Sequence, residues 1–162
     1  MAAANNRVVL LGRLLKRLDK FSVGSFRDRL IFQKTVYLLQ AKGVFLGYSF
    51  NWYLHGPYSP VLARDGFELS TVYEGLAPYA FREPKTESSF EEFRKFIGSN
   101  GNNPDWLEAA ASIHFLRKAY PFETRNETIK RVMAKGAHLS KQLCESVWVA
   151  LVDAGLISDP AR

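Results

Sequence analysis

The sequence predicts a mainly α-helical, compact multi-helix domain with a small β-strand or hairpin near residues 44–55. Apolar side chains recur at helical spacing through most of the 162 residues, and helix-capping pairs such as Ser-Pro and Asn-Pro separate these stretches. The segment 44–55 instead alternates large apolar with other side chains. The length and the 47% hydrophobic content suit one core, so we expect a single domain over residues 1–162, with a winged-helix-like arrangement as one option.

The first predicted helix carries cations on the face opposite its leucines, which lie at positions 11, 14, 15 and 18. These cations are Arg13, Lys16, Arg17 and Lys20. Residues 1–64 contain ten Lys or Arg and two Asp, a net charge of +8, although the whole chain has only +6. Such a basic stripe attracts nucleic-acid phosphates or an acidic protein partner. A solvated helix face that binds nothing has the same pattern, so the stripe alone does not choose between them.

A second helix and an alternating stretch follow. The spacing of apolar residues over 30–42 predicts a helix that ends at Gly43, because glycine readily adopts the left-handed conformation. Over residues 45–54 every even-numbered position is large and apolar, which predicts a half-buried strand or hairpin arm whose bulk packs on the helices.

A turn and a new helix come next. The sequence His-Gly-Pro-Tyr at 55–58 favours a turn, since proline fixes φ and glycine accepts unusual backbone angles. Ser59 followed by Pro60 is typical of a helix N-cap and first helical residue. Tyr53, on the odd-numbered side, and Tyr58, in the turn, are the aromatic residues with most chance of exposure; exposed tyrosine anchors protein interfaces and also stacks on bases.

The rest of the sequence predicts further helices that are joined by short connectors. Pro78 and the segment 83–88 are polar or contain proline and lack periodicity, so we expect a flexible surface loop there. Ser88 and Glu91 have the spacing of a capping box ahead of a short helix. Three later helices are expected to start at the capping residues Asn103, Thr124 and Ser140. The last of these helices is expected to end at Gly155.

Two C-terminal helices, 127–135 and 140–154, have the spacing of a helix-turn-helix, whose second helix would read the major groove of DNA. The second helix offers few groups that read bases, chiefly Lys141, Gln142 and Glu145. A simple packing pair of helices is therefore the favoured interpretation.

Few residues of this sequence are of the types that act in catalysis or bind metals. The three histidines, His55, His114 and His138, have no accompanying metal-ligand spacing, and we predict neither a metal nor a cofactor. A catalytic site would need His55, Asp65 and His114 to converge, since an acid can orient a histidine that transfers protons. The single cysteine, Cys144, lies on an apolar helix face and is expected to be a buried structural thiol. We therefore expect no catalytic residues.

The run FQKTVYLLQAKGVFLGYSFNWYLHGPYSPVLARD, residues 32–65, is similar to the YwgA-like family of small prokaryotic proteins. It more distantly resembles the Panacea or SocA-like antitoxin domain. The similarity to the first family extends into residues 106–116 and 154–157. This resemblance implies a non-enzymatic, mainly helical cytoplasmic module whose distant relatives act through protein contacts, some of them as antitoxins.

The sequence thus predicts a regulatory or adaptor module that contacts an acidic protein partner. The expected contact residues are Tyr53, His55 and Tyr58, with charge steering from the basic stripe. The alternative is a nucleic-acid-binding protein that uses the same stripe. No stretch approaches the ~18 apolar residues that cross a bilayer, and the start MAAANNR lacks the features of a signal peptide, so we expect a cytoplasmic protein without membrane partners.

Overall fold

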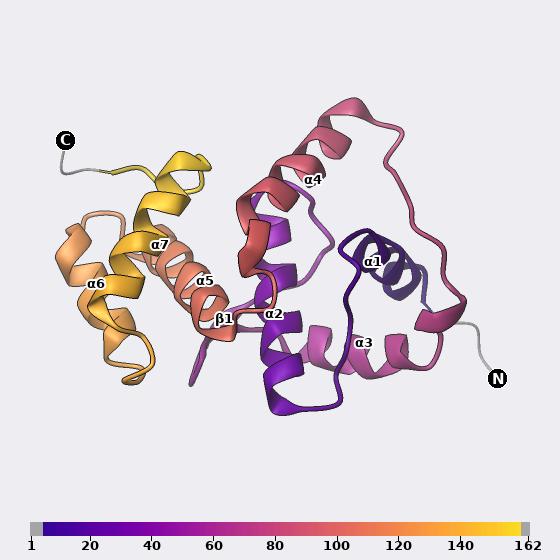
Figure 1. The fold of residues 1–162 in the computed structure, drawn as a ribbon, viewed down its shortest axis with the longest axis horizontal. Helices are drawn as coiled ribbons and strands as arrows, with labels where there is room; N and C mark the ends of the chain where they lie inside the picture. Colours follow the sequence, from indigo (N-terminus) through magenta and orange to yellow (C-terminus); the bar gives the residue numbers. More distant parts are fainter. Residues whose placement is uncertain (1–4, 160–162) are drawn as a thin grey trace.

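The computed structural model describes residues 5–159, which form a mainly helical fold with a small antiparallel sheet (Figure 1). The helices are α1 (Asn6–Arg17), α2 (Phe26–Ala41), α3 (Pro60–Ser70), α4 (Pro84–Ile97), α5 (Pro104–Ala119), α6 (Arg125–Met133) and α7 (Lys141–Asp153). The strands are β1 (Asn51–Tyr53) and β2 (Gly56–Tyr58), and two 3-10 turns are η1 (Tyr73–Gly75) and η2 (Gly98–Asn100). The predicted fold class is confirmed.

The packing of α2 against α5 joins the two ends of the molecule. At one end α1 packs on α3, and at the other α6 and α7 pack on α5 and on each other (Figure 1). The short hairpin lies against α2 and α5, between these two ends. None of the helices formed by residues 5–159 has the length and apolar character needed to cross a membrane.

Most of the predicted helix starts are confirmed by the hydrogen bonds of the capping side chains. The Ser59 hydroxyl accepts a bond of 3.2 Å from the amide of Leu62, with Pro60 as first helical residue. Asn103, Thr124 and Ser140 cap α5, α6 and α7 in the same way. Gly43 follows the end of α2 with a φ of 112°, as its left-handed role requires.

The predicted loop is only partly correct: Pro78 and Glu83 lie in a connector without helix or strand, but residues 84–88 are helical because α4 begins at Pro84. The carboxylate of Glu83 caps this helix by accepting bonds from the amides of Lys85 and Thr86. Glutamate is an uncommon N-cap residue, so the sequence did not indicate a helix start here. The first turns of α4 are polar because they face Arg17, which lies far away in the sequence. The capping box predicted at Ser88 is likewise wrong, since this residue lies inside α4.

The β element is displaced from the predicted 44–55 to residues 51–58. Its register pairs Asn51 with Tyr58 and Tyr53 with Gly56. The predicted alternation of burial does hold from residue 44 to residue 49, but this stretch has no strand neighbour. Instead the side chain of Gln40 takes that place: its carbonyl accepts from the amides of Leu46 and Tyr48, and its amide donates to the Tyr48 carbonyl.

Candidate functional site

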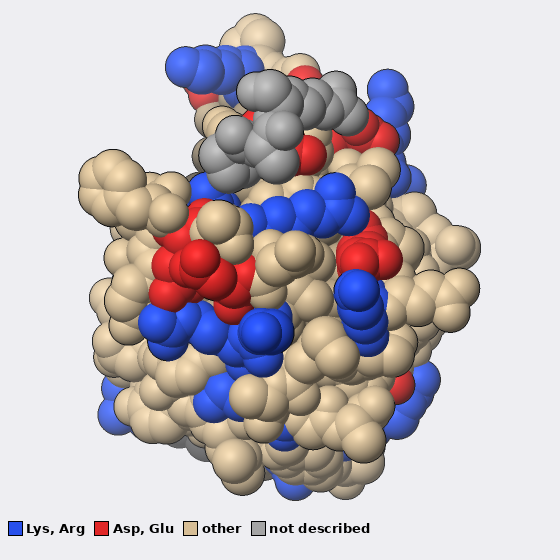
Figure 2. Space-filling model, turned by 90° about the vertical axis from the view of Figure 1, so that its left-hand side faces the viewer, with Lys and Arg blue, Asp and Glu red and all other residues tan. Residues whose placement is uncertain are grey.

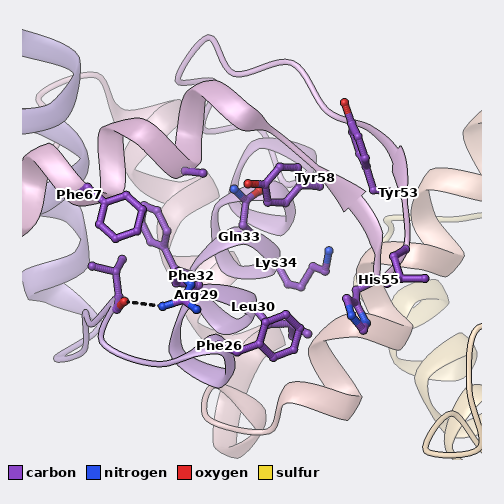
Figure 3. Close-up of a pocket in the computed structure, with 13 residues that line it drawn as sticks. Phe26, Arg29, Leu30, Phe32, Gln33, Lys34, Tyr53, His55, Tyr58 and Phe67 are labelled. Atoms are coloured by element: carbon purple, nitrogen blue, oxygen red, sulfur yellow. Dashed lines mark hydrogen bonds between the residues drawn. The ribbon is translucent and has the colours of Figure 1, made fainter.

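An apolar pocket of about 410 Å³ lies between α2, the hairpin and α3; we call it the aromatic pocket (Figure 3). Its walls are formed mainly by Phe26, Leu30, Phe32, Leu54, Ala63 and Phe67. Three residues that the sequence predicted as contact residues, Tyr53, His55 and Tyr58, line the same pocket. Ligand and peptide sites in proteins have this size and this mainly apolar character.

Large apolar side chains around the mouth of the aromatic pocket are exposed to solvent. Phe26 is 57% exposed, Phe67 54%, Tyr53 45% and Leu54 74%. The exposure of Leu54 contradicts its predicted place on the buried face; it lies in the two-residue turn of the hairpin, where no neighbour covers it. Exposed apolar side chains that gather around one cavity are typical of an interaction site.

The hairpin holds the predicted contact residues together. The rings of Tyr53 and Tyr58 meet edge to face with their centroids 5.3 Å apart, and the His55 ring lies 5.1 Å from that of Phe26. The turn between the strands requires Gly56, whose φ is 87° and whose α-carbon packs against Ser112 on α5. This close approach fixes the hairpin on α5 and with it the orientation of the three side chains.

Cationic groups lie among the apolar walls. Lys34, only 2% exposed, donates a hydrogen bond of 2.6 Å from its ammonium to the Pro57 carbonyl. Burial lowers the pKa of Lys34 to about 8, although attraction to Glu108 opposes this. Arg29 donates from Nη1 to the Val23 carbonyl over 3.1 Å (Figure 3). Within residues 5–159, no Asp or Glu lines this pocket.

A buried carboxylate, Glu108 on α5, lies behind the hairpin. Its Oε1 atom is 3.1 Å from Nε2 of His138 and 3.8 Å from Nδ1 of His55. Glu108 is 2% exposed, and its Oε2 atom has no hydrogen-bond partner in the described part of the chain. Sequence reasoning missed this residue; the available signal was an acid among the buried alanines of an apolar helix.

The three residues of the predicted catalytic alternative lie in separate environments. His55 is beside Glu108, whereas Asp65 pairs with Arg7 at 2.9 Å. His114 shares a hydrogen bond of 2.7 Å with the hydroxyl of Tyr37. Over residues 5–159, no three His, Cys, Asp or Glu side chains are grouped as metal ligands. Cys144 is fully buried, and burial raises the pKa of its thiol to about 11.

The buried His114 gives a testable pH dependence. Burial lowers its pKa to about 4, so between about pH 6.5 and 4 the unfolded chain binds a proton that the folded chain does not. The free energy of unfolding should therefore fall by up to about 3 kcal/mol as the pH drops through this window. His114→Gln should lose this part of the slope in urea unfolding at a series of pH values. An unchanged slope would show that His114 does not cause it.

The four residues of the basic stripe make contacts within the molecule. Arg13 donates to the Ala77 carbonyl over 3.0 Å, and the Lys16 ammonium lies 4.0 Å from the centroid of the Tyr73 ring. Arg17 pairs with carboxylates of α4, and the Lys20 ammonium bonds to the Gly101 carbonyl. The prediction that Lys20 continues the helical face is wrong, because α1 ends at Arg17 and the left-handed Asp19 (φ 58°) turns the chain away.

The C-terminal helices present mixed charge. Figure 2 shows the face formed by α6 and α7, where Lys and Arg lie beside Asp and Glu. One such pair joins Arg131 and Glu123 at 2.6 Å, and Lys141 lies 3.9 Å from Glu145. Phosphate binding is strongest where positive charge is continuous, which this face does not provide.

Comparisons of the chain with protein-family models, with curated proteins and with solved structures give no match. The similarity of residues 32–65 to the YwgA-like family therefore stays a prediction.

Proposed function

We propose that this protein is a non-enzymatic regulatory or adaptor module that binds a protein partner through the mouth of the aromatic pocket. The observation that carries the proposal is the cluster of exposed side chains there: Phe26, Tyr53, Leu54 and Phe67. Aromatic residues beside a concave apolar surface are the groups that contribute most to protein-protein affinity.

The charge of the pocket favours an acidic and apolar partner segment. Arg29 and Lys34 line it, and within the described residues no acid does. Opposite charges across an interface raise the association rate and exclude partners of the wrong sign. The predicted resemblance to antitoxin-like proteins agrees with a function through protein contacts.

A peptide selection tests this proposal. We expect the immobilised protein to enrich peptides that combine apolar and acidic residues from a random displayed library. Synthetic copies of these peptides should bind Phe67→Ser and Tyr58→Ala at least about tenfold more weakly, a loss of about 1.4 kcal/mol. Phe122→Ser is the matched control, because Phe122 is fully exposed and does not line the aromatic pocket. Equal affinities for all four proteins would overturn the proposal.

The alternative, nucleic-acid binding, is separated by salt dependence. Arg17 is paired with carboxylates of α4, and Lys20 lies beyond the end of α1, so the four cations do not form one continuous row of positive charge. We therefore expect little binding of mixed single-stranded DNA and RNA probes even at low salt. Lys16→Ala should leave both probe and peptide binding nearly unchanged, because the Lys16 ammonium lies against the Tyr73 ring and does not line the aromatic pocket. Slower association of the peptides with this variant would instead support charge steering by the basic stripe. A steep loss of probe affinity with added salt would instead support the nucleic-acid function.

A further inference from the structure

We infer that the inner end of the aromatic pocket binds a small apolar carboxylate, such as a medium-chain fatty acid, with the carboxylate on Lys34. This site lies inside the exposed mouth proposed for partner binding. It does not depend on the existence of a protein partner, and its test uses no peptide.

The dimensions and walls of the pocket fit such a ligand. A volume of about 410 Å³ is within the range of small-molecule sites and exceeds what one protein side chain fills. Leu30, Phe32 and Ala63 line the pocket and offer contacts for a hydrocarbon body (Figure 3). Removing hydrocarbon from water is favourable by roughly 25 cal/mol for each Å² that becomes buried.

The charge within the pocket favours an anion. The Lys34 ammonium has three hydrogens and donates one hydrogen bond, to the Pro57 carbonyl. The buried carboxylate that attracts Lys34, that of Glu108, lies beside His55 and His138 and does not line the pocket. Burial, together with repulsion from Lys135, outweighs the attraction of Glu108 and lowers the pKa of Lys34 to about 8, so the positive charge of Lys34 is incompletely compensated.

A ligand carboxylate would supply the missing compensation. Charge-assisted hydrogen bonds between an ammonium and a carboxylate are about twice as strong as neutral ones, and more so away from water. Arg29 also lines the pocket and adds positive potential there, while its Nη1 atom bonds to the Val23 carbonyl. The same charge disfavours amines, and a neutral alcohol gains the apolar contacts only.

Calorimetric titration with octanoate, 1-octanol and octylamine tests the site. For the wild-type protein we expect octanoate to bind at least tenfold more tightly than octanol, and octylamine to bind most weakly. Lys34→Met should weaken octanoate binding at least tenfold and leave octanol binding unchanged or tighter. Arg29→Gln is a second variant, at a partly exposed position, and should weaken octanoate binding by a smaller factor than Lys34→Met.

Lys20→Met is the matched control. Like Lys34, Lys20 bonds to a backbone carbonyl and has a pKa that burial lowers to about 8, but it is only partly buried and lines a different pocket. Its replacement should leave octanoate binding unchanged. Thermal unfolding establishes that each variant is folded before titration. If Lys34→Met does not fold, the comparison of Arg29→Gln with the wild type decides.

The pH dependence of the wild-type protein gives a readout that needs no variant. Octanoate affinity should decrease several-fold from pH 7 to pH 10 as Lys34 loses its proton, while octanol affinity should stay constant. Octanoate that binds no more tightly than octanol at pH 7, or that binds equally well to wild type and to a folded Arg29→Gln or Lys34→Met, would overturn the inference.

Discussion

Replacement of Gly56 by alanine should destabilise the protein by about 3 kcal/mol, as measured by urea unfolding. Two effects combine. The φ of 87° at Gly56 is unfavourable for a residue with a β-carbon, and that β-carbon would overlap the hydroxyl oxygen of Ser112 on α5. Either the buried Ser112 side chain must rotate or the strands and α5 must move apart, and the second change would also displace the hairpin that carries Tyr53 and Tyr58.

Gly47 provides the matched control. Its φ is 86°, nearly that of Gly56, but a β-carbon there would meet no atom within 4 Å. Gly47→Ala should therefore cost only the backbone strain, about 1 kcal/mol. In the Gly56→Ala/Ser112→Ala double variant the overlapping hydroxyl is removed, and this hydroxyl has no hydrogen-bond partner in residues 5–159. Its stability should approach that of Gly47→Ala. A Gly56→Ala variant as stable as Gly47→Ala would contradict the close packing of the hairpin on α5.

Replacement of Arg17 by methionine should cost about 2 kcal/mol, although Arg17 belongs to the predicted partner-binding stripe. Its side chain is only 11% exposed and bonds to both carboxylate oxygens of Glu87 and to Glu91. The guanidinium also lies 4.1 Å from the centroid of the Phe90 ring. Removal of a cation that joins α1 to α4 leaves two carboxylates without their main partner.

Arg94→Met is the control for Arg17→Met. Arg94 pairs with the same Glu91 at 3.3 Å, but both side chains are nearly half exposed, so the loss should stay below about 0.5 kcal/mol. The pH dependence supplies a second readout. The hydrogen bond from Arg17 lowers the pKa of Glu87, so its stabilisation is present above about pH 4.5 and is lost below it; Arg17→Met should flatten this slope. Equal losses in the two variants would show that Arg17 is an ordinary surface cation.

The sequence was sufficient wherever the deciding interaction is local. Ser59 caps α3 by bonding three residues ahead, and Gly43 ends α2 through its own backbone angle. The grouping of Tyr53, His55 and Tyr58 around one pocket also followed from a short stretch, because a two-residue turn brings its flanking strands together. The strand predicted from residue 44 onward is absent because the side chain of Gln40, rather than a second strand, accepts hydrogen bonds from the amides of Leu46 and Tyr48.

By itself, therefore, the sequence determined the helical fold class, most of the predicted helix starts and the tight turn after Tyr53, since each rests on contacts within a few residues. Only the tertiary structure decided which charged side chains are available to bind a partner or ligand and which are used in contacts within the molecule. Arg17 meets Glu87, 70 positions away, and Lys20 reaches Gly101, 81 positions away, so these cations hold helices and connectors together. Lys34 and Glu108 became buried charges only when α2, the hairpin and α5 packed, because desolvation depends on every element that covers a side chain.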